Sequence, residues 1–453
     1  MRTRIALCWA AVALSLVCQI SQAQTAATPP PSDQNRLDKL EQRLNQLEAE
    51  VKSRDEEIAR LKSQLTAPQS TQPTGDEIER TKQDVLKDLE SRQASPLTLR
   101  TPANFNPDVA VVIDALGSWS NQRSNNAYNR IDVREAELDL RAAIDPRADG
   151  VLVLAFPRDV DNFPFPEAGD PQTSPETGAA VEEAYAFFHD FGVPNLTAKL
   201  GRFHLRFGRQ NVLHLHDLPT SDPPLVNQAF LAPEALSDSG LSLSYVIPPK
   251  LIGDQYVELV AEVLAGEGGD SASPTLTGDL TVDSPALNLH ALWNHDITSD
   301  MNLELGGSWL TASRSADNSE RVNLFGFDAT LVRTDPTGQF NNQLLQAEVM
   351  HAIVDQPDGG ATQHAWGAYV LGQQQIHKDW YAGVRVDWTQ NPNADDQEIW
   401  AVSPYVSWYW SEFLRFRVEY QHRDGDPENA DAIYLQATYI FGAHPPHPYW
   451  SMR

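Results

Sequence analysis

The property that most constrains this chain is a two-residue alternation of apolar and polar side chains, which recurs in short segments between residues 97 and 441. Residues 413–423 show it clearly, with apolar side chains at alternate positions: Leu414, Phe416, Val418 and Tyr420. The positions between them carry Arg415, Arg417, Glu419 and Gln421. Successive side chains of a β-strand point to opposite faces of its sheet. We therefore expect many strands that each have one apolar face and one wet face.

The wet face excludes a sandwich core on that side, because charged side chains in strand after strand cannot be packed without water or partners. The apolar face must then contact lipid or a second sheet. Aromatic residues near the predicted strand ends favour lipid, because membrane barrels carry aromatic girdles at both interfaces. These residues are Trp366, Trp380, Tyr381, Trp388, Trp400, Trp408 and Trp410. A soluble β-sandwich also alternates, but it seldom repeats the pattern so often.

Roughly sixteen such segments lie between Val109 and Phe441, and a barrel of that size is wide enough for an aqueous channel. The sequence therefore predicts an all-β transmembrane barrel of about 16 antiparallel strands over residues 97–441, followed by a C-terminal tail, 442–453. No mature segment is apolar for long enough to form a membrane-spanning helix.

The connections between the predicted strands alternate between short turns, such as 145–147, and long acidic segments. The long segments are 157–180, 266–285, 355–362, 391–397 and 424–432. Short turns at one end and long loops at the other are typical of outer-membrane barrels. Segment 221–239 is long, Pro-rich and moderately apolar, and we predict that it folds inward as a constriction. The alternative is an outer loop that packs against a neighbouring protomer.

Residues 1–23 have the features of a secretory signal peptide, with Arg2 and Arg4 before an apolar run over residues 5–17. The run is shorter than the roughly 20 residues that a spanning helix needs, so we expect it to be removed rather than to anchor the protein.

Both cysteines, Cys8 and Cys18, lie in this segment, so we expect no disulfide or thiol chemistry in the mature protein. The bulky Val17 argues against lipid attachment at Cys18. The formal net charge is −28, and it becomes −30 when the two signal-peptide arginines are lost. So acidic a protein is a poor partner for nucleic acid, whose phosphates require lysine and arginine.

Residues 24–34 are interpreted as a linker, and residues 35–65 repeat apolar side chains with a heptad period. Position a holds Leu37, Leu44, Val51, Ile58 and Leu65, and position d holds Leu40, Leu47, Arg54 and Leu61. Three of the four g–e′ pairs of a parallel assembly join opposite charges, which predicts a coiled coil and a homo-oligomer. A lone amphipathic helix is the alternative. Residues 66–96 are interpreted as a second linker and a second helix.

Glu182-Glu183-Ala184-Tyr185, followed by Leu-Gly-Arg-Phe-His-Leu-Arg-Phe-Gly-Arg at residues 200–209, resembles the phosphate-selective porin O and P family. The resemblance implies a trimeric sixteen-stranded channel in the bacterial outer membrane, with its coiled coil in the periplasm. It also implies contact with outer-membrane lipid and lipopolysaccharide, and we add peptidoglycan as a partner of the coiled coil. The acidic composition departs from the basic lumen of phosphate channels, so the resemblance does not extend to phosphate as the solute.

The densest basic cluster consists of Lys199, Arg202, His204, Arg206, Arg209, His214 and His216. Strand alternation predicts that Arg202, His204 and Arg206 point into the lumen and that Phe203, Leu205 and Phe207 occupy the opposite face. Arg415 and Arg417 are expected across the lumen. Such a stripe polarises a pore and selects ions. The alternative, to which we give equal weight, is that these cations stabilise the barrel wall through ion pairs with Glu135, Glu137 and Asp139.

His214 and His216, beside Asp217, form a further candidate site. Two imidazoles two positions apart on a strand share a face and can bind zinc with a third ligand, although loop histidines that bind nothing are more common.

The sequence contains no G-x-S-x-G or H-E-x-x-H motif, so we expect neither an enzyme nor a cofactor. The sequence predicts an outer-membrane porin that passes small hydrophilic solutes passively, with anions as one candidate class. Two alternatives remain: a structural anchor that reaches the cell wall through the coiled coil, and a metal-binding or metal-passing channel.

Overall fold

The computed structural model describes residues 107–121, 129–157, 179–266, 285–313, 320–338, 340–356, 360–394, 397–425 and 429–442. The predicted signal peptide, both linkers, the coiled coil, the second helix and most of the predicted tail lie outside these residues.

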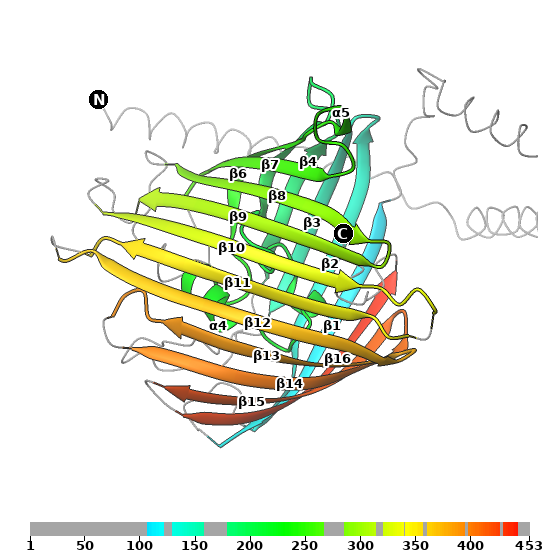
Figure 1. Ribbon diagram of the computed structural model, residues 1–453, viewed down its shortest axis with the longest axis vertical. Helices are drawn as coiled ribbons and strands as arrows, with labels where there is room; N and C mark the ends of the chain where they lie inside the picture. Colours follow the sequence, from blue (N-terminus) through cyan, green and yellow to red (C-terminus); the bar gives the residue numbers. More distant parts are fainter. Residues whose placement is uncertain are drawn as a thin grey trace, which may run out of the picture. The chain divides into compact units, whose positions relative to one another are not determined.

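The described residues form sixteen strands that close into one antiparallel barrel (Figure 1). The first eight are β1 (Asp108–Ser120), β2 (Arg130–Asp145), β3 (Ala148–Pro157), β4 (Ala180–Phe188), β5 (Leu196–His204), β6 (Ser237–Val246), β7 (Tyr256–Leu264) and β8 (Ala286–Thr298). The others are β9 (Met301–Ser313), β10 (Arg321–Arg333), β11 (Gln343–Val354), β12 (Gln363–His377), β13 (Trp380–Gln390), β14 (Glu398–Ser411), β15 (Leu414–Gly425) and β16 (Ala430–Gly442). Three short helices accompany them: η1 (Leu215–Asp217), α4 (Leu225–Phe230) and α5 (Pro249–Ile252).

Every strand pairs with its neighbours in sequence, and β16 returns to pair with β1. This closing pair runs from Ala110 opposite Gly442 to Ser120 opposite Ala432. Closure leaves no sheet edge with unpaired backbone groups, which is the condition for a strand-built protein to stand in lipid. The predicted sixteen-stranded antiparallel barrel is thus confirmed.

The connections differ between the two ends of the barrel. At one end the turns are tight: β2 ends at Asp145 and β3 begins at Ala148, and β12 ends at His377 just before β13 begins at Trp380. At the other end the connections are longer, as between β3 and β4 or between β7 and β8. Strand β1 begins, and β16 ends, at the tight-turn end. This is the predicted alternation of short and long connections.

The outer face of the barrel carries the exposed apolar side chains that the alternation predicts. On β13, Val384 and Val386 are exposed, whereas Arg385 between them is fully buried on the lumen side. Aromatic residues meet across strands at both ends of this outer face. Trp380 lies opposite Trp408, and Trp388 lies opposite Trp400.

One of these aromatic pairs is stacked, with 5.2 Å between the ring centroids of Trp380 and Trp408. Trp388 lies eight positions along β13 from Trp380, a rise of roughly 26 Å at about 3.3 Å per residue. At the strand tilt of about 35–45° found in such barrels, this length projects to roughly 20 Å along the barrel axis, so both aromatic levels fall within the apolar band of about 25 Å that membrane barrels present. None of the helices among the described residues is long and apolar enough to cross a membrane.

Candidate functional site

The connection between β5 and β6, residues 205–236, folds into the barrel, and we call it the lumen loop. It includes η1 and α4, and Figure 1 shows α4 among the strands, with β12 and β13 as its neighbours. The side chains of Leu225, Val226 and Phe230 on α4 are fully buried. Complete burial of a side chain such as Phe230 contributes roughly 1.5–3 kcal/mol. The predicted inward folding of segment 221–239 is confirmed for the part up to residue 236, and the loop begins earlier than expected, directly after His204.

The structure corrects the predicted orientation of Phe203 on β5 and of Leu205 and Phe207 at the start of the lumen loop. Their exposed fractions are 0–1%, and they belong to the same buried apolar cluster as Leu225 and Phe230 of the lumen loop. The prediction that they occupy the face opposite the lumen was wrong. The alternation of apolar and polar residues continues in the sequence after β5 ends at His204. Alternation alone does not show whether the apolar side chains contact lipid outside the barrel or a loop inside it.

Two glycines adapt the chain and the wall to this loop. Gly208 has φ of +59°, in the left-handed region that favours glycine, and a Cβ there would lie 2.5 Å from a carboxylate oxygen of Glu348. Gly326 on β10 leaves room for a loop side chain, because a Cβ at this position would lie 2.7 Å from the ring of Phe207. The wall is therefore shaped to receive the loop.

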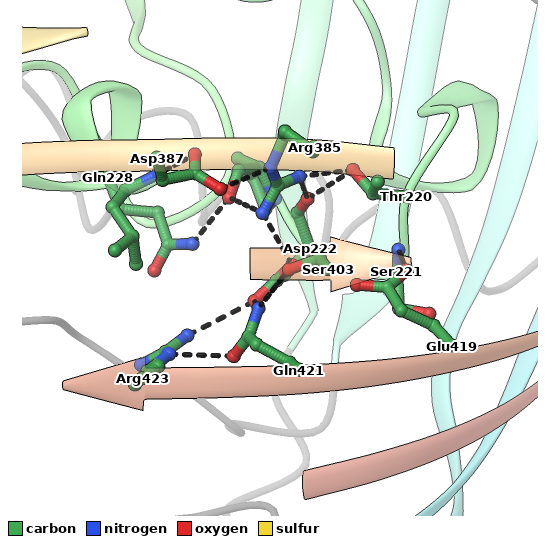
Figure 2. Close-up of polar contacts among 12 residues, drawn as sticks. Thr220, Ser221, Asp222, Gln228, Arg385, Asp387, Ser403, Glu419, Gln421 and Arg423 are labelled. Carbon is green, nitrogen blue, oxygen red and sulfur yellow. Dashed lines mark hydrogen bonds and ion pairs between the residues drawn. The ribbon is translucent and has the colours of Figure 1, made fainter. Parts of the chain in front are cut away.

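The centre of the lumen loop is held by a cluster of charges around Arg385 on β13 (Figure 2). Arg385 Nη2 lies 3.1 Å from Asp222 Oδ1, and Arg385 Nε lies 2.7 Å from Asp387 Oδ2. Arg423 on β15 reaches the other oxygen of Asp222 at 3.2 Å. Arg385 also donates to the carbonyl oxygens of Asp222 and Pro223, so one guanidinium binds both the side chain and the backbone of the loop.

Carboxylates of the wall accept hydrogen bonds from the loop backbone at widely separated strands. Glu348 on β11 accepts from the N–H groups of Arg209 and Gln210 at 2.8 and 2.9 Å. Glu419 on β15 accepts from Ser221 N at 2.7 Å. These bonds satisfy polar backbone groups that become buried when the loop folds inward. Each such group would destabilise the protein by about 1–3 kcal/mol if it had no hydrogen-bond partner.

Arg415 and Arg417, predicted to line the pore, bind the lumen loop as well. Arg415 donates to the carbonyl oxygen of His216, and Arg417 donates to that of Leu218 at 2.7 Å. Both side chains are buried, with exposed fractions of 2%. Both arginines therefore connect strand β15 of the wall to the lumen loop.

The other predicted pore residues are placed differently. Lys199 Nζ lies 4.8 Å from the ring centroid of Tyr185, in a cation–π contact. Arg202 Nε is buried without a hydrogen-bond partner in the described part of the chain. Arg206 is partly exposed and binds Glu262 through its backbone N–H, and Arg209 Nε lies 3.7 Å from Glu304.

Of the three β2 carboxylates predicted to pair with this basic cluster, only Glu137 contacts its members among the described residues, through His214 and His216, and none pairs with its arginines. Asp139 pairs with Arg141 at 2.8 Å, two positions away on the same strand. Glu137 contacts His216, and Glu135 has no hydrogen-bond partner among the described residues. Sequence spacing does not reveal which of several lumen-facing cations a carboxylate meets.

His214 and His216 lie with His204 in a group of imidazoles and carboxylates contributed by β2, β4, β5 and the lumen loop. His214 Nδ1 lies 3.1 Å from Glu182 Oε1, and His216 Nδ1 lies 2.8 Å from Glu137 Oε1. Burial lowers the pKa of His216, but Glu137 and Asp217 outweigh it and raise this pKa to about 9. The pKa of His214 is raised well above its ordinary value, because Glu182 and Glu137 outweigh burial in the same way.

No protein-family model matches the chain. An uncharacterized protein of Aquifex aeolicus (strain VF5) is 23% identical over 417 residues, which cover 80% of this chain and 83% of that protein.

Among solved structures, OprB of Pseudomonas putida is similar at 14% identity with a TM-score of 0.49, over 74% of this chain and 94% of OprB. The outer membrane channel DcaP of Acinetobacter baumannii is similar at 12% identity with a TM-score of 0.48, over 77% and 100% of the two chains. An anion-selective porin of Comamonas acidovorans is similar at 9% identity with a TM-score of 0.49, over 74% and 99%.

Proposed function

We propose that this protein is an outer-membrane porin, a passive channel for small hydrophilic solutes in which the lumen loop forms the constriction. The observation that carries the proposal is the lumen loop itself, which lies inside a closed barrel and is hydrogen-bonded to strands as far apart as β7, β11 and β15. A barrel of this strand number that served only as an anchor would have no need of a loop braced across its interior.

The two faces of the wall support a channel in a membrane. The outer face exposes apolar side chains between two aromatic levels, which suits lipid on all sides. The lumen face carries charged and amide side chains, which suits water and polar solutes. The tight-turn end then corresponds to the periplasm, where outer-membrane barrels place their short turns.

We assign selectivity to cations other than the wall arginines that bind the lumen loop, which are Arg385, Arg415, Arg417 and Arg423. The candidate selectivity residues are then Lys199 and Arg202 on β5 and Arg206 and Arg209 on the lumen loop, and small anions are the candidate solutes. The resemblance to the phosphate-selective porins supports passive transport, and phosphate itself is one member of the panel to be tested. A homotrimer, contact with lipopolysaccharide, and a periplasmic coiled coil that reaches peptidoglycan complete the proposal.

The test is single-channel conductance in planar bilayers. The purified full chain should produce stepwise conductance, and replacement of residues 221–233 by a short Gly-Ser linker should increase the step size, because the constriction is removed. The matched control replaces residues 249–252 in α5, which lies in a connection outside the lumen, and should leave the step size unchanged. A folded protein with no conductance at any voltage would overturn the proposal.

A further inference from the structure

The imidazole–carboxylate group between the wall and the lumen loop suggests a function that the channel itself does not require. It comprises His204, His214 and His216 together with Glu135, Glu137, Glu182 and Glu183. Its residues come from β2, β4, β5 and the lumen loop, so side chains distant in sequence converge at one point of the lumen wall.

Three donor atoms of this group have the spacing of a coordination sphere. Glu182 Oε1 lies 3.2 Å from His204 Nε2 and 3.1 Å from His214 Nδ1. All three ligand atoms lie within 4.8 Å of one another. In a tetrahedral zinc site with bonds of about 2.0–2.1 Å, neighbouring ligand atoms lie roughly 3.3 Å apart. Two of the three edges therefore already have the length that a bound ion would impose.

The surroundings of these donors also resemble those of a metal centre. His214 uses its second ring nitrogen, Nε2, to contact Glu183 Oε2 at 3.4 Å. Metal-binding histidines characteristically donate their second N–H to a carboxylate, which fixes the ring and its tautomer. Glu182 and His214 are partly accessible, with side-chain exposed fractions of 12 and 13%, so an ion from the lumen can reach them.

A second observation concerns a buried carboxylate beside this group. Glu135 is 2% exposed, and neither of its carboxylate oxygens has a hydrogen-bond partner among the described residues. One of these oxygens lies within 4.8 Å of the nearest donors of Glu137 and His216. Glu137 connects this trio to the first one, because its Oε2 lies 3.7 Å from His214 Nδ1. A buried carboxylate without a partner is costly. A divalent ion close by offsets this cost.

We propose that Glu182, His204 and His214 bind one divalent transition-metal ion of the zinc type, with Glu183 as the residue that orients His214. Two nitrogens and one carboxylate oxygen select this class of ion over Mg²⁺ and Ca²⁺, which prefer all-oxygen sites. The ion would join β4, β5 and the lumen loop, because each contributes one ligand. It would therefore fix the loop to the wall at β4 and β5. In the ring of sixteen strands, β5 lies eight strands away from β13, which carries Arg385.

The test uses the full-length folded barrel in detergent, titrated with Zn²⁺ alone by calorimetry and with Co²⁺ alone by visible absorption. We expect one equivalent of Zn²⁺ per chain and a Co²⁺ spectrum of tetrahedral type. Glu182→Gln and His204→Ala should each abolish both signals. Glu183→Gln should weaken binding roughly 10–100-fold, as the loss of an orienting carboxylate does elsewhere.

The matched control is His189→Ala, which removes the imidazole of an exposed histidine–carboxylate pair with Asp149 at the tight-turn end. It should bind Zn²⁺ as the wild type does. The heat-dependent shift in electrophoretic mobility that folded barrels show verifies folding of each variant. Absence of Zn²⁺ binding by the wild type, or unchanged binding by folded Glu182→Gln, would overturn the proposal. Binding that is lost only in His216→Ala would also overturn it, because it would move the site to Glu135 and Glu137.

Discussion

Arg385 and Asp222 are 163 positions apart in the sequence, yet 3.1 Å separates Arg385 Nη2 from Asp222 Oδ1 inside the barrel. The pair joins β13 to the lumen loop, and Asp387 at 2.7 Å on the other side of the guanidinium completes the charge balance. Because Arg385 is fully buried, its charge depends entirely on these partners.

Replacement of Arg385 by methionine should destabilise the barrel strongly. The change leaves Asp387 buried without its ion-pair partner, and breaking a buried pair on one side costs about 3–5 kcal/mol. Denaturant unfolding followed by tryptophan fluorescence measures the effect. Arg333→Met is the control, because its pair with Asp300 at 3.4 Å is exposed to solvent and should contribute little to stability. Equal losses in the two variants would contradict the role of Arg385.

The same contact predicts how the lumen loop responds to acid. Burial alone raises the pKa of Asp222, but Arg385 and Arg423 outweigh it and hold this pKa below the ordinary value of 3.8. Since the folded pKa is lowered, the carboxylate's contribution is complete above 3.8 and is lost only as the pH falls through the lower, folded value. The contribution of Asp222 to the single-channel conductance, measured as the difference between the wild type and Asp222→Asn, should therefore stay constant from neutral pH to about pH 4 and change in stronger acid.

Asp222→Asn provides the comparison for this pH dependence. The variant should already show altered conductance or gating noise at neutral pH. Because asparagine does not titrate, position 222 should then cause no further change in conductance as the pH falls. The opposite result would be a change in wild-type conductance well above pH 4 that is absent in Asp222→Asn. It would show that the carboxylate of Asp222 is not held in its charged form.

Substitution of Gly326 by alanine should displace the lumen loop. The new Cβ would lie 2.7 Å from the ring of Phe207, and overpacking of this kind costs about 1–3 kcal/mol. Gly307→Ala on the neighbouring strand β9 is the control, because a Cβ there meets nothing within 4 Å. The additional change Phe207→Leu should restore part of the loss, and unfolding of the single and double variants measures this coupling. Additive losses would sink the explanation.

The two kinds of arginine in the lumen should differ in their effect on ion selectivity. Arg206 is partly exposed, so Arg206→Ala, like Arg202→Ala, should shift the reversal potential in a salt gradient toward cations. The guanidinium of Arg417 donates hydrogen bonds to the carbonyl oxygen of Leu218 and to the side-chain oxygen of Gln436. Arg417→Ala should therefore lower stability and increase conductance noise. Unchanged selectivity in both Arg202→Ala and Arg206→Ala would assign the basic cluster to bracing instead.

Much of the barrel could be predicted from the sequence because strand alternation is a local property. On β13, Val384 and Val386 face outward while Arg385 and Asp387 face the lumen, and this follows from their order alone. The composition of segment 221–239 likewise indicated a loop that buries apolar residues. Closure of β1 on β16 followed from the strand number and from the need to leave no edge in lipid.

The partners inside the lumen could not be predicted, because they depend on how strands distant in sequence are placed around the ring. Asp222 could have met any lumen-facing cation, and the pattern did not indicate Arg385 in particular. The end of β5 was missed for a related reason. Phe203, Leu205 and Phe207 continue an alternating pattern although the strand stops at His204, since only the presence of a loop inside the barrel distinguishes an interior apolar site from a lipid-facing one.

The contacts of the lumen loop set a minimum length of chain for its placement. The loop precedes β11, β13 and β15 in the sequence, but it depends on Glu348, Arg385 and Glu419 on those strands for its polar partners. A chain that stops before β13 lacks two of these three partners and could not hold the loop as the closed barrel does. The position of a segment near the middle of the sequence is thus encoded mainly by residues that follow it.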